Sequence, residues 1–336
     1  MAAIPQDPVL IIGGSGVVGS LAARMLRQAQ PELPITIGGR DLAKAKAVAR
    51  GIGKADAAAI DLDRADLGLP EGRRHSAIVV FVKDAGLNAL HYAQAHGIPH
   101  LSVSSGVFEV GPEMALQVHK PQAAPVLMAS HWLAGVAVLP ALHHARDFAR
   151  VDAIRIGVVL DEQDMGGPAA YADYERLTTA APHALILKDG KWNWAKGEDG
   201  ARRFVNVDGT ELPGQAYSPL DVISLAAATS ARDIRVDLHY GISAGRQQGG
   251  AFSSDLVIEI AGEGRDGKPL SQRHEISHPQ GQAPITALGV TVGTERLLGL
   301  AGGPPVQPGL YLPETLIEPA YFIARLEGIG TTFRRA

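Results

Sequence analysis

The stretch VLIIGGSGVVGS, residues 9–20, decides the fold of the N-terminal part of this chain. An apolar run typical of a buried strand comes first, and Gly14, Gly16 and Gly19 follow with the spacing G-x-G-x-x-G. In a βαβ unit this spacing marks a sharp turn from a strand into a helix whose first N–H groups bind a pyrophosphate. The stretch therefore predicts a Rossmann domain that binds a dinucleotide.

The residues of this turn have distinct predicted roles. Gly14 permits the tight turn, Gly16 lets the backbone approach the pyrophosphate, and Gly19 allows the helix to pack closely on the strand. We expect three further residues beside the phosphates, namely Ser15, Val17 and Val18. The alternative is a glycine-rich turn in a Rossmann domain that has lost its cofactor.

The hydrophobic pattern divides the chain into two parts. Between residues 8 and 127, apolar runs alternate with segments of helical spacing, as βαβ units require. Farther on, strand-like runs meet at turn pairs, which predicts hairpins at LILKDGKWNW, RFVNVDGTEL and LVIEIAGEGRDGKPLSQRHEIS. We expect an α/β fold with a Rossmann domain at 1–127, to which 305–336 return, and an α+β substrate or dimerisation domain with a mostly antiparallel sheet at 128–304.

Composition excludes several classes of protein. The 336 residues carry a net charge of -4 without a basic block, which disfavours nucleic acid as a partner. No apolar run approaches the roughly 18 residues of a membrane span, and residues 1–8 do not resemble a signal peptide, so we expect a cytoplasmic protein without a membrane partner. The absence of cysteine excludes disulfides, thiolate zinc sites and thiol nucleophiles.

The end of the second predicted strand indicates which dinucleotide binds. NAD-binding domains carry an Asp or Glu there, which accepts hydrogen bonds from the ribose hydroxyls. Here Arg40 follows Gly39, and Lys44 lies one helical turn later. A guanidinium at this place favours a 2′-phosphate, so we predict NADP(H) as the cofactor. The alternative is that Asp41 is the ribose acceptor and does not cap the next helix.

Four more residues are expected near the cofactor because of their places at strand ends. Asp61 follows the third strand and is expected to approach the adenine. Val82 and Lys83 end the next strand, whose carboxyl edge faces the nicotinamide side in this fold, and Ser104 ends the strand after it.

Four segments resemble the saccharopine dehydrogenase-like family: GGSGVVGS (13–20), GGRDLAKA (38–45), GIPHLSVSSG (97–106) and, more loosely, GLYLPETLIEPAYFIARL (309–326). The resemblance covers the first 110 residues well. The chain departs from the family's pattern around Ser102, where the family often has Asp. The resemblance implies hydride transfer between NADP(H) and a carbon–nitrogen bond, as in an imine reductase or an opine dehydrogenase.

Reduction of a C=N or C=O bond needs a proton at the heteroatom, or a substrate that arrives protonated. The candidates are His131, whose ordinary pKa suits the task, and Lys83 at a strand end. Asp164 and Tyr171 flank a Gly-Gly-Pro bend that is expected to close over the nicotinamide. Each of the four has a surface or packing role as its alternative.

Two other motifs are interpreted as accidental. HEISH, residues 274–278, matches a zinc-protease signature, but in a strand its two histidines lie about 13 Å apart and cannot share one metal. GISAG around Ser243 lacks the strong helix that must follow a hydrolase nucleophile. We expect no metal site.

The sequence thus favours an NADPH-dependent oxidoreductase, expected as a homodimer, that acts on a small-molecule imine or amine. The alternatives are an NADP-dependent carbonyl reductase and a non-catalytic NADP(H)-binding sensor. A carboxylate-bearing opine needs an arginine fork, for which the second domain offers Arg202, Arg203 and Arg246. An uncharged imine is expected instead if these arginines point away from the cleft.

Overall fold

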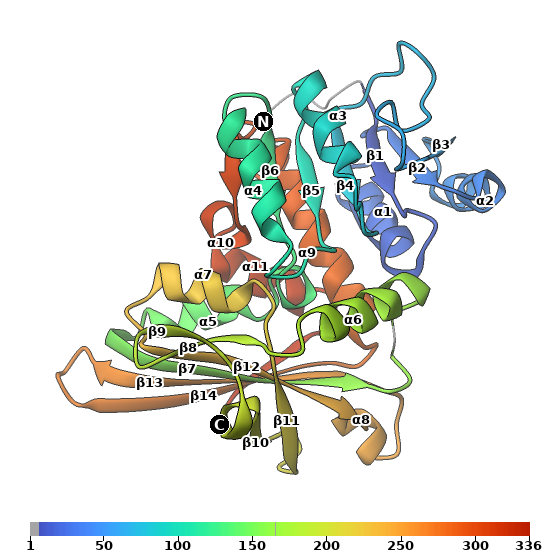
Figure 1. The fold of residues 1–336 in the computed structure, drawn as a ribbon. Helices are drawn as coiled ribbons and strands as arrows, with labels where there is room; N and C mark the ends of the chain where they lie inside the picture. Colours follow the sequence, from blue (N-terminus) through green and yellow to red (C-terminus); the bar gives the residue numbers. More distant parts are fainter. Residues whose placement is uncertain (1–6, 165) are drawn as a thin grey trace. The chain divides into compact units, whose positions relative to one another are not determined.

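The computed structural model describes residues 7–164 and 166–336, which form two compact units (Figure 1). The first unit runs up to Ser130 and takes in Thr286–Ile317. The second comprises His131–Ile285 and Glu318–Ala336.

These boundaries differ from the predicted ones at the C-terminal end. The chain returns to the first unit at residue 286, within helix α9 (Gln282–Leu297), because Gly293 of that helix lets Leu101 and Leu127 of the Rossmann sheet pack against it. The chain then leaves the first unit again at residue 318. The segment after that adds strand β16 (Thr332–Arg335) to the sheet of the second unit.

The first unit is a parallel sheet of seven strands in the order β15-β6-β5-β4-β1-β2-β3. This is the Rossmann order with one strand added at an edge, which confirms the predicted fold class. The strands are β1 (Val9–Ile12), β2 (Ile35–Gly39), β3 (Ala55–Ala59), β4 (Ala77–Val80), β5 (His100–Ser102), β6 (Pro125–Met128) and β15 (Gly309–Tyr311). The helices besides α9 are α1 (Val17–Ala29), α2 (Leu42–Ile52), α3 (Asn88–His96), α4 (Val110–His119) and α10 (Pro313–Leu316).

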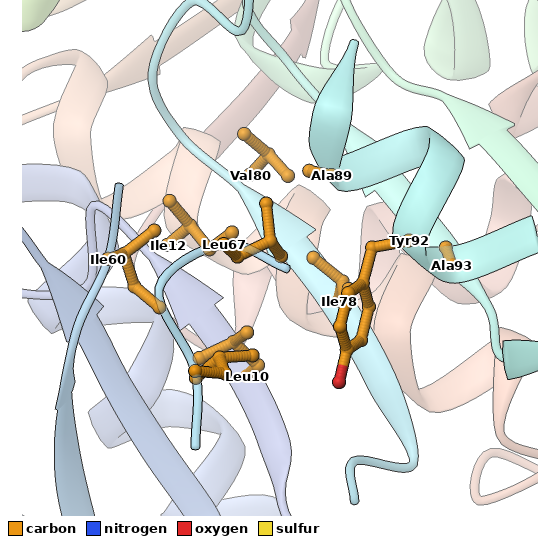
Figure 2. Packing of buried hydrophobic residues seen from close by; sticks show 10 residues of the cluster. Leu10, Ile12, Ile60, Leu67, Ile78, Val80, Ala89, Tyr92 and Ala93 are labelled. Carbon is orange, nitrogen blue, oxygen red and sulfur yellow. The ribbon is translucent and has the colours of Figure 1, made fainter. Parts of the chain in front are cut away.

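The core of this unit explains why its strands are continuous apolar runs. Leu10 and Ile12 of β1 lie in register with Ile78 and Val80 of β4, and all four pack with Tyr92 of α3 (Figure 2). Helices cover both faces of a parallel sheet, so every residue of these strands is buried. The turns that carry the site are therefore anchored on a rigid sheet.

The second unit is built on a mixed sheet of nine strands. The main path is β10-β11-β12-β7-β13-β14-β16, and β8 pairs with β12 and β9. Its strands besides β16 are β7 (Phe148–Asp161), β8 (Leu185–Lys188), β9 (Lys191–Trp194), β10 (Ala201–Val205), β11 (Glu211–Tyr217), β12 (Asp233–Gly241), β13 (Ser254–Gly264) and β14 (Pro269–His278). Its helices are α5 (Val138–Ala145), α6 (Pro168–Ala180), α7 (Asp221–Ala228), α8 (Ala244–Gln247) and α11 (Pro319–Glu327), with short 3-10 turns at Trp132–Ala134 and Gly197–Gly200.

The predicted hairpins β8–β9, β10–β11 and β13–β14 are confirmed, and the sheet is mostly antiparallel, as expected. The exception is β12, which pairs with β7 in parallel along Ala153–Asp161. No helix in the described part of the chain is both long and apolar enough to cross a membrane.

One face of this sheet carries a chain of ion pairs. Asp237, whose side chain is fully buried, accepts a hydrogen bond from Arg202 Nε at 2.8 Å and pairs with Arg235 at 2.5 Å. Arg202 also pairs with Glu259 at 2.9 Å, so charges on β10, β12 and β13 are linked in series. Because strands alternate their side chains, the opposite face remains free for apolar residues such as Ile156.

Candidate functional site

The glycine-rich turn between β1 and α1 is held by its own backbone. Gly13 N donates to Gly38 O at 2.9 Å, and Gly16 N donates to Gly13 O at 2.9 Å. Gly13 has a φ of 81°, so the left-handed conformation of the turn lies at Gly13. Gly14 is needed for a different reason, since a Cβ there would lie 2.7 Å from Ile11 O.

Helix α1 begins immediately after this turn with its first N–H groups available to an anion. Gly16 is its N-cap residue and has extended backbone angles. Val17, Val18 and Gly19 are its first three residues, and its first turn carries no acidic side chain. The N–H groups of a first turn have no carbonyl partner within the helix, and the helix dipole adds partial positive charge there. These features fit a pyrophosphate.

The end of β2 lies beside this turn, as a Rossmann cofactor site requires. A Cβ on Gly39 would lie 3.3 Å from Ser15 Oγ, so the two residues are adjacent. Arg40 follows and is exposed, and Lys44 is exposed on the first turn of α2. Asp41 is the N-cap residue of α2, and its Oδ1 accepts a hydrogen bond from Lys44 N at 3.0 Å. Asp41 is thus engaged as a helix cap.

The structure separates the remaining predicted cofactor residues into two groups. Val82 lies against the glycine turn, because a Cβ on Gly13 would come within 3.1 Å of its Cγ1. Ser104 is buried at the end of β5. Asp61 is exposed and accepts a hydrogen bond from Asp63 N at 3.0 Å, which gives it a turn-forming role.

Lys83 has partners that the sequence did not reveal. Its Nζ lies 3.2 Å from Glu109 Oε2, and the same oxygen accepts a hydrogen bond from Gly106 N at 2.8 Å. Glu113, on α4, bonds to Ser105 Oγ nearby. Burial raises the pKa of Glu113, while the charge of Lys83 lowers it. The carboxyl edge of β4 and β5 therefore carries a partly buried cluster of ionisable groups.

The three catalytic candidates in the second unit occupy different environments. His131 Nε2 and Ser224 Oγ are hydrogen-bonded at 2.7 Å, and burial lowers the pKa of His131 to about 3. The ring is therefore neutral at pH 7, which removes the argument that its ordinary pKa suits proton donation. Tyr171 is exposed on α6, and its pKa is raised by the charge of Glu175.

Asp164 is the candidate whose acidity lies nearest to neutral pH. Its Oδ2 accepts a hydrogen bond from Gln282 N, the first residue of α9, at 2.6 Å. Burial raises the pKa of Asp164 to about 6, and the charge of Asp161 acts in the same direction. The carboxyl combines a structural role at the helix start with a proton affinity suited to acid–base chemistry.

The two motifs interpreted as accidental lie in hydrogen-bonded, structured segments. HEISH lies on β14, where His278 Nδ1 bonds to Thr331 Oγ1 at 3.1 Å. Ser243 is fully buried, and its Oγ accepts a hydrogen bond from Ser253 N at 3.0 Å. Within residues 7–164 and 166–336, no group of three or more His, Cys, Asp or Glu side chains is arranged to hold a metal ion.

His274 of the HEISH segment stacks on His144 of α5, with ring centroids 3.4 Å apart. Burial lowers the pKa of both rings to about 4, and the positive charge of Arg335 acts in the same direction. Well above pH 6.5 both rings are neutral whether the protein is folded or unfolded. As the pH falls from 6.5 towards 4, the unfolded chain takes up protons that the folded protein does not, so stability is lost.

We therefore expect the free energy of unfolding to fall more steeply with acid in the native protein than in a His274→Asn variant. Between pH 7 and pH 5 the difference should be about 1 kcal/mol, a value that allows for solvent screening of His144. Urea unfolding at several pH values measures this. The exposed His183→Asn variant is the control and should follow the native curve, and parallel curves for native protein and His274→Asn would contradict the prediction.

A solved dehydrogenase structure has this fold over almost the whole chain. No protein-family model matches the sequence, and a search of curated proteins finds no relative. Among solved structures, saccharopine dehydrogenase (L-Glu forming) from Saccharomyces cerevisiae has a TM-score of 0.69 and 14% identity, over 98% of this chain and 100% of that one. A myo-inositol dehydrogenase from Corynebacterium glutamicum has a TM-score of 0.47 and 12% identity, over 97% of this chain and 98% of the other.

GenD2 from gentamicin A biosynthesis, solved in complex with NAD, has a TM-score of 0.48 and 11% identity, over 100% of this chain and 98% of that one. The likeness to saccharopine dehydrogenase confirms the expected fold over almost the whole chain. Fold and glycine turn together define a Rossmann-type dinucleotide-binding architecture. In particular, it is the architecture of saccharopine dehydrogenase.

Proposed function

We propose that this protein is an NADP(H)-dependent oxidoreductase that acts on a carbon–nitrogen bond of a small-molecule substrate. The observation that carries the proposal is the glycine turn of β1–α1 beside Arg40. When bound there, NADPH supplies the hydride. The choice of a C=N bond rests on the resemblance to saccharopine dehydrogenase-like proteins, whose fold this chain shares.

The choice of NADP(H) rests on the chemistry at the end of β2. Asp41, the only acid directly after that strand, uses its Oδ1 to cap α2. Arg40 and Lys44 are both exposed near the same strand end and carry positive charge. Two cations favour the additional phosphate of NADP(H), and a guanidinium binds phosphate oxygens through two parallel hydrogen bonds.

The substrate class follows from the state of the arginines in the second unit. Arg202 pairs with Asp237 and Glu259, Arg203 with Glu211, and Arg246 with Asp161 and Glu162. Each guanidinium therefore already has a carboxylate partner within its own unit. We infer that the substrate is an imine that carries no carboxylate, because these three arginines already pair with carboxylates of the protein.

Fluorescence titration with NADPH and NADH tests the cofactor site. The native protein should bind NADPH more tightly than NADH, and Arg40→Ala should weaken NADPH binding by about 10- to 100-fold with little effect on NADH. This range corresponds to the roughly 1.5–3 kcal/mol of a hydrogen bond to a charged group. The exposed Arg50, in the last turn of α2, is the control, and Arg50→Ala should bind like the native protein.

Two outcomes would contradict the proposal. Equal affinities for NADPH and NADH in the native protein would remove the choice of NADP(H), and no binding of either would remove the oxidoreductase itself. If NADPH binds, its oxidation in the presence of cyclic imines without carboxylates tests the reaction. Oxidation only with carboxylate-bearing substrates would overturn the substrate class.

A further inference from the structure

A small cavity with polar side chains on one part of its wall lies inside the first unit at the carboxyl ends of β4 and β5. Apolar residues of β4 and of the segment leading into α3 form one part of its wall. The polar part consists of side chains that are all at least nine-tenths buried, namely Asp84, His100, Ser102, Ser104, Ser105 and Glu113. Such a concentration of buried polar groups is unusual for the core of a parallel sheet.

Four buried atoms at this cavity have no hydrogen-bond partner among the described residues: Asp84 Oδ1, His100 Nδ1, Ser102 Oγ and Glu113 Oε2. The other oxygens of the two carboxyls are engaged, since Asp84 Oδ2 accepts from Ala89 N at 2.7 Å and Glu113 Oε1 bonds to Ser105 Oγ. Buried polar atoms in native proteins are almost always satisfied. A cavity that offers two to four such partners to one molecule is a site for water.

The polar wall results from the alternation of side chains along β5 and the residues after it. His100, Ser102 and Ser104 share one face, and the intervening Leu101 packs towards α9 on the other. The polar row thus runs from the interior of the sheet to its carboxyl edge. At that edge lies the Lys83–Glu109 pair, with Nζ and Oε2 3.2 Å apart.

The charges at this edge are unbalanced if every group is ionised. Asp84, Glu109 and Glu113 then carry three negative charges, and Lys83 carries one positive charge. Burial raises the pKa of Asp84 and of Glu113, and the charge of Asp84 raises that of Glu113 further. Protonation of a buried carboxyl relieves this imbalance without a metal ion.

We propose that this cavity binds water, and that Glu113 and Asp84 store a proton there that replenishes Lys83 during turnover. The proposal rests on the proposed function. In the reductive direction, the hydride adds to the carbon of the C=N bond and the Lys83 ammonium gives one proton to the nitrogen. The Glu113 carboxyl then returns a proton through the water to the Lys83 amine, and solvent reprotonates Glu113. Glu113 is thus a positioning and proton-storing residue behind Lys83.

Infrared difference spectroscopy of the full chain tests the store without any substrate. A protonated carboxylic acid has a C=O stretch that shifts in D₂O, and we expect this band at pH 7 in the native protein. Glu113→Gln should remove it or reduce it at least about twofold, because the amide keeps the shape of the acid but carries no titratable proton. Asp84→Asn is the second variant, and the exposed Glu71→Gln is the control that should leave the band unchanged.

A missing band in the native protein, or a band that survives both variants, would overturn the proposal. A high-resolution crystal structure gives an independent result. Water bonded to Ser102 Oγ and Glu113 Oε2 supports the proposal, whereas a dry cavity or a bound monovalent cation overturns it.

With an imine substrate, Glu113→Gln should lower kcat by at least about tenfold and change the pH profile of kcat, with the affinity for NADPH unchanged. If NADPH does not bind, the proposed function is refuted. The infrared and crystallographic results then still decide whether the cavity binds water and whether Glu113 stores a proton.

Discussion

Replacement of Asp237 by alanine should lower the free energy of unfolding by about 3–5 kcal/mol. The Asp237 carboxylate is fully buried between the guanidinium groups of Arg202 and Arg235, whose side chains are 20% and 15% exposed. Truncation leaves Arg235 without the carboxylate of Asp237 and leaves Arg202 with Glu259 alone. Breaking a buried pair in this way costs far more than the net contribution of the intact pair, because the remaining charges have lost water and part of their counter-charge.

Urea unfolding at pH 7 measures the change, with the slope on urea concentration checked to remain constant. Glu211→Ala is a matched control, since Glu211 and Arg203 form an ion pair on the same sheet with both side chains 58% exposed. The free energy of unfolding of Glu211→Ala should fall by no more than about 1 kcal/mol. Asp237→Asn keeps the shape and one acceptor oxygen, so it should fall between the two. Equal losses for Asp237→Ala and Glu211→Ala would contradict the role assigned to burial.

The sequence was sufficient for the N-terminal part of the first unit because its signals are local, but it did not give the bounds of the segment that returns at Thr286–Ile317. The apolar runs of β1 and β4, the glycine spacing and the helix cap at Asp41 each act within a few residues. The hairpins of the second unit were predictable for the same reason, since each turn lies between the strands that it joins. The parallel pairing of β12 with β7 was not predictable, because about 70 residues separate the two strands and no turn specifies their register.

The candidate site was only partly predictable from the sequence. Arg40 and Asp41 each allowed two roles, and the hydrogen bond from Lys44 N to Asp41 Oδ1 favours one of them. His131 was chosen because the ordinary pKa of histidine suits proton transfer. Burial lowers the pKa of this ring to about 3, and no sequence pattern indicates that burial. Glu113 was missed altogether. The signal that was available is the alternation of polar residues in HLSVS, which departs from the apolar pattern of a central parallel strand.

The second large effect concerns the cofactor, since Gly19→Ala should weaken NADPH binding by at least about 100-fold, or about 2.7 kcal/mol. A Cβ on Gly19 would lie 2.4 Å from Gly13 O and 2.9 Å from Gly14 Cα. Both are backbone atoms of the turn itself, so no side-chain rotation relieves the overlap. Helix α1 must move away from the turn, and its first N–H groups then no longer converge with the turn on one phosphate.

Two variants separate this effect from a general loss of stability. A Cβ on Gly51, in the last turn of α2, would meet nothing within 4 Å, so Gly51→Ala should bind NADPH normally and gain about 0.5 kcal/mol of stability. A Cβ on Gly16 would lie 3.2 Å from Gly13 O, and Gly16→Ala should show an intermediate loss of affinity. Thermal unfolding of each variant without cofactor shows whether the fold is retained. A folded Gly19→Ala protein that binds NADPH like the native one would mean that the phosphates do not lie on this turn, and the cofactor site would then have to be sought elsewhere in the chain.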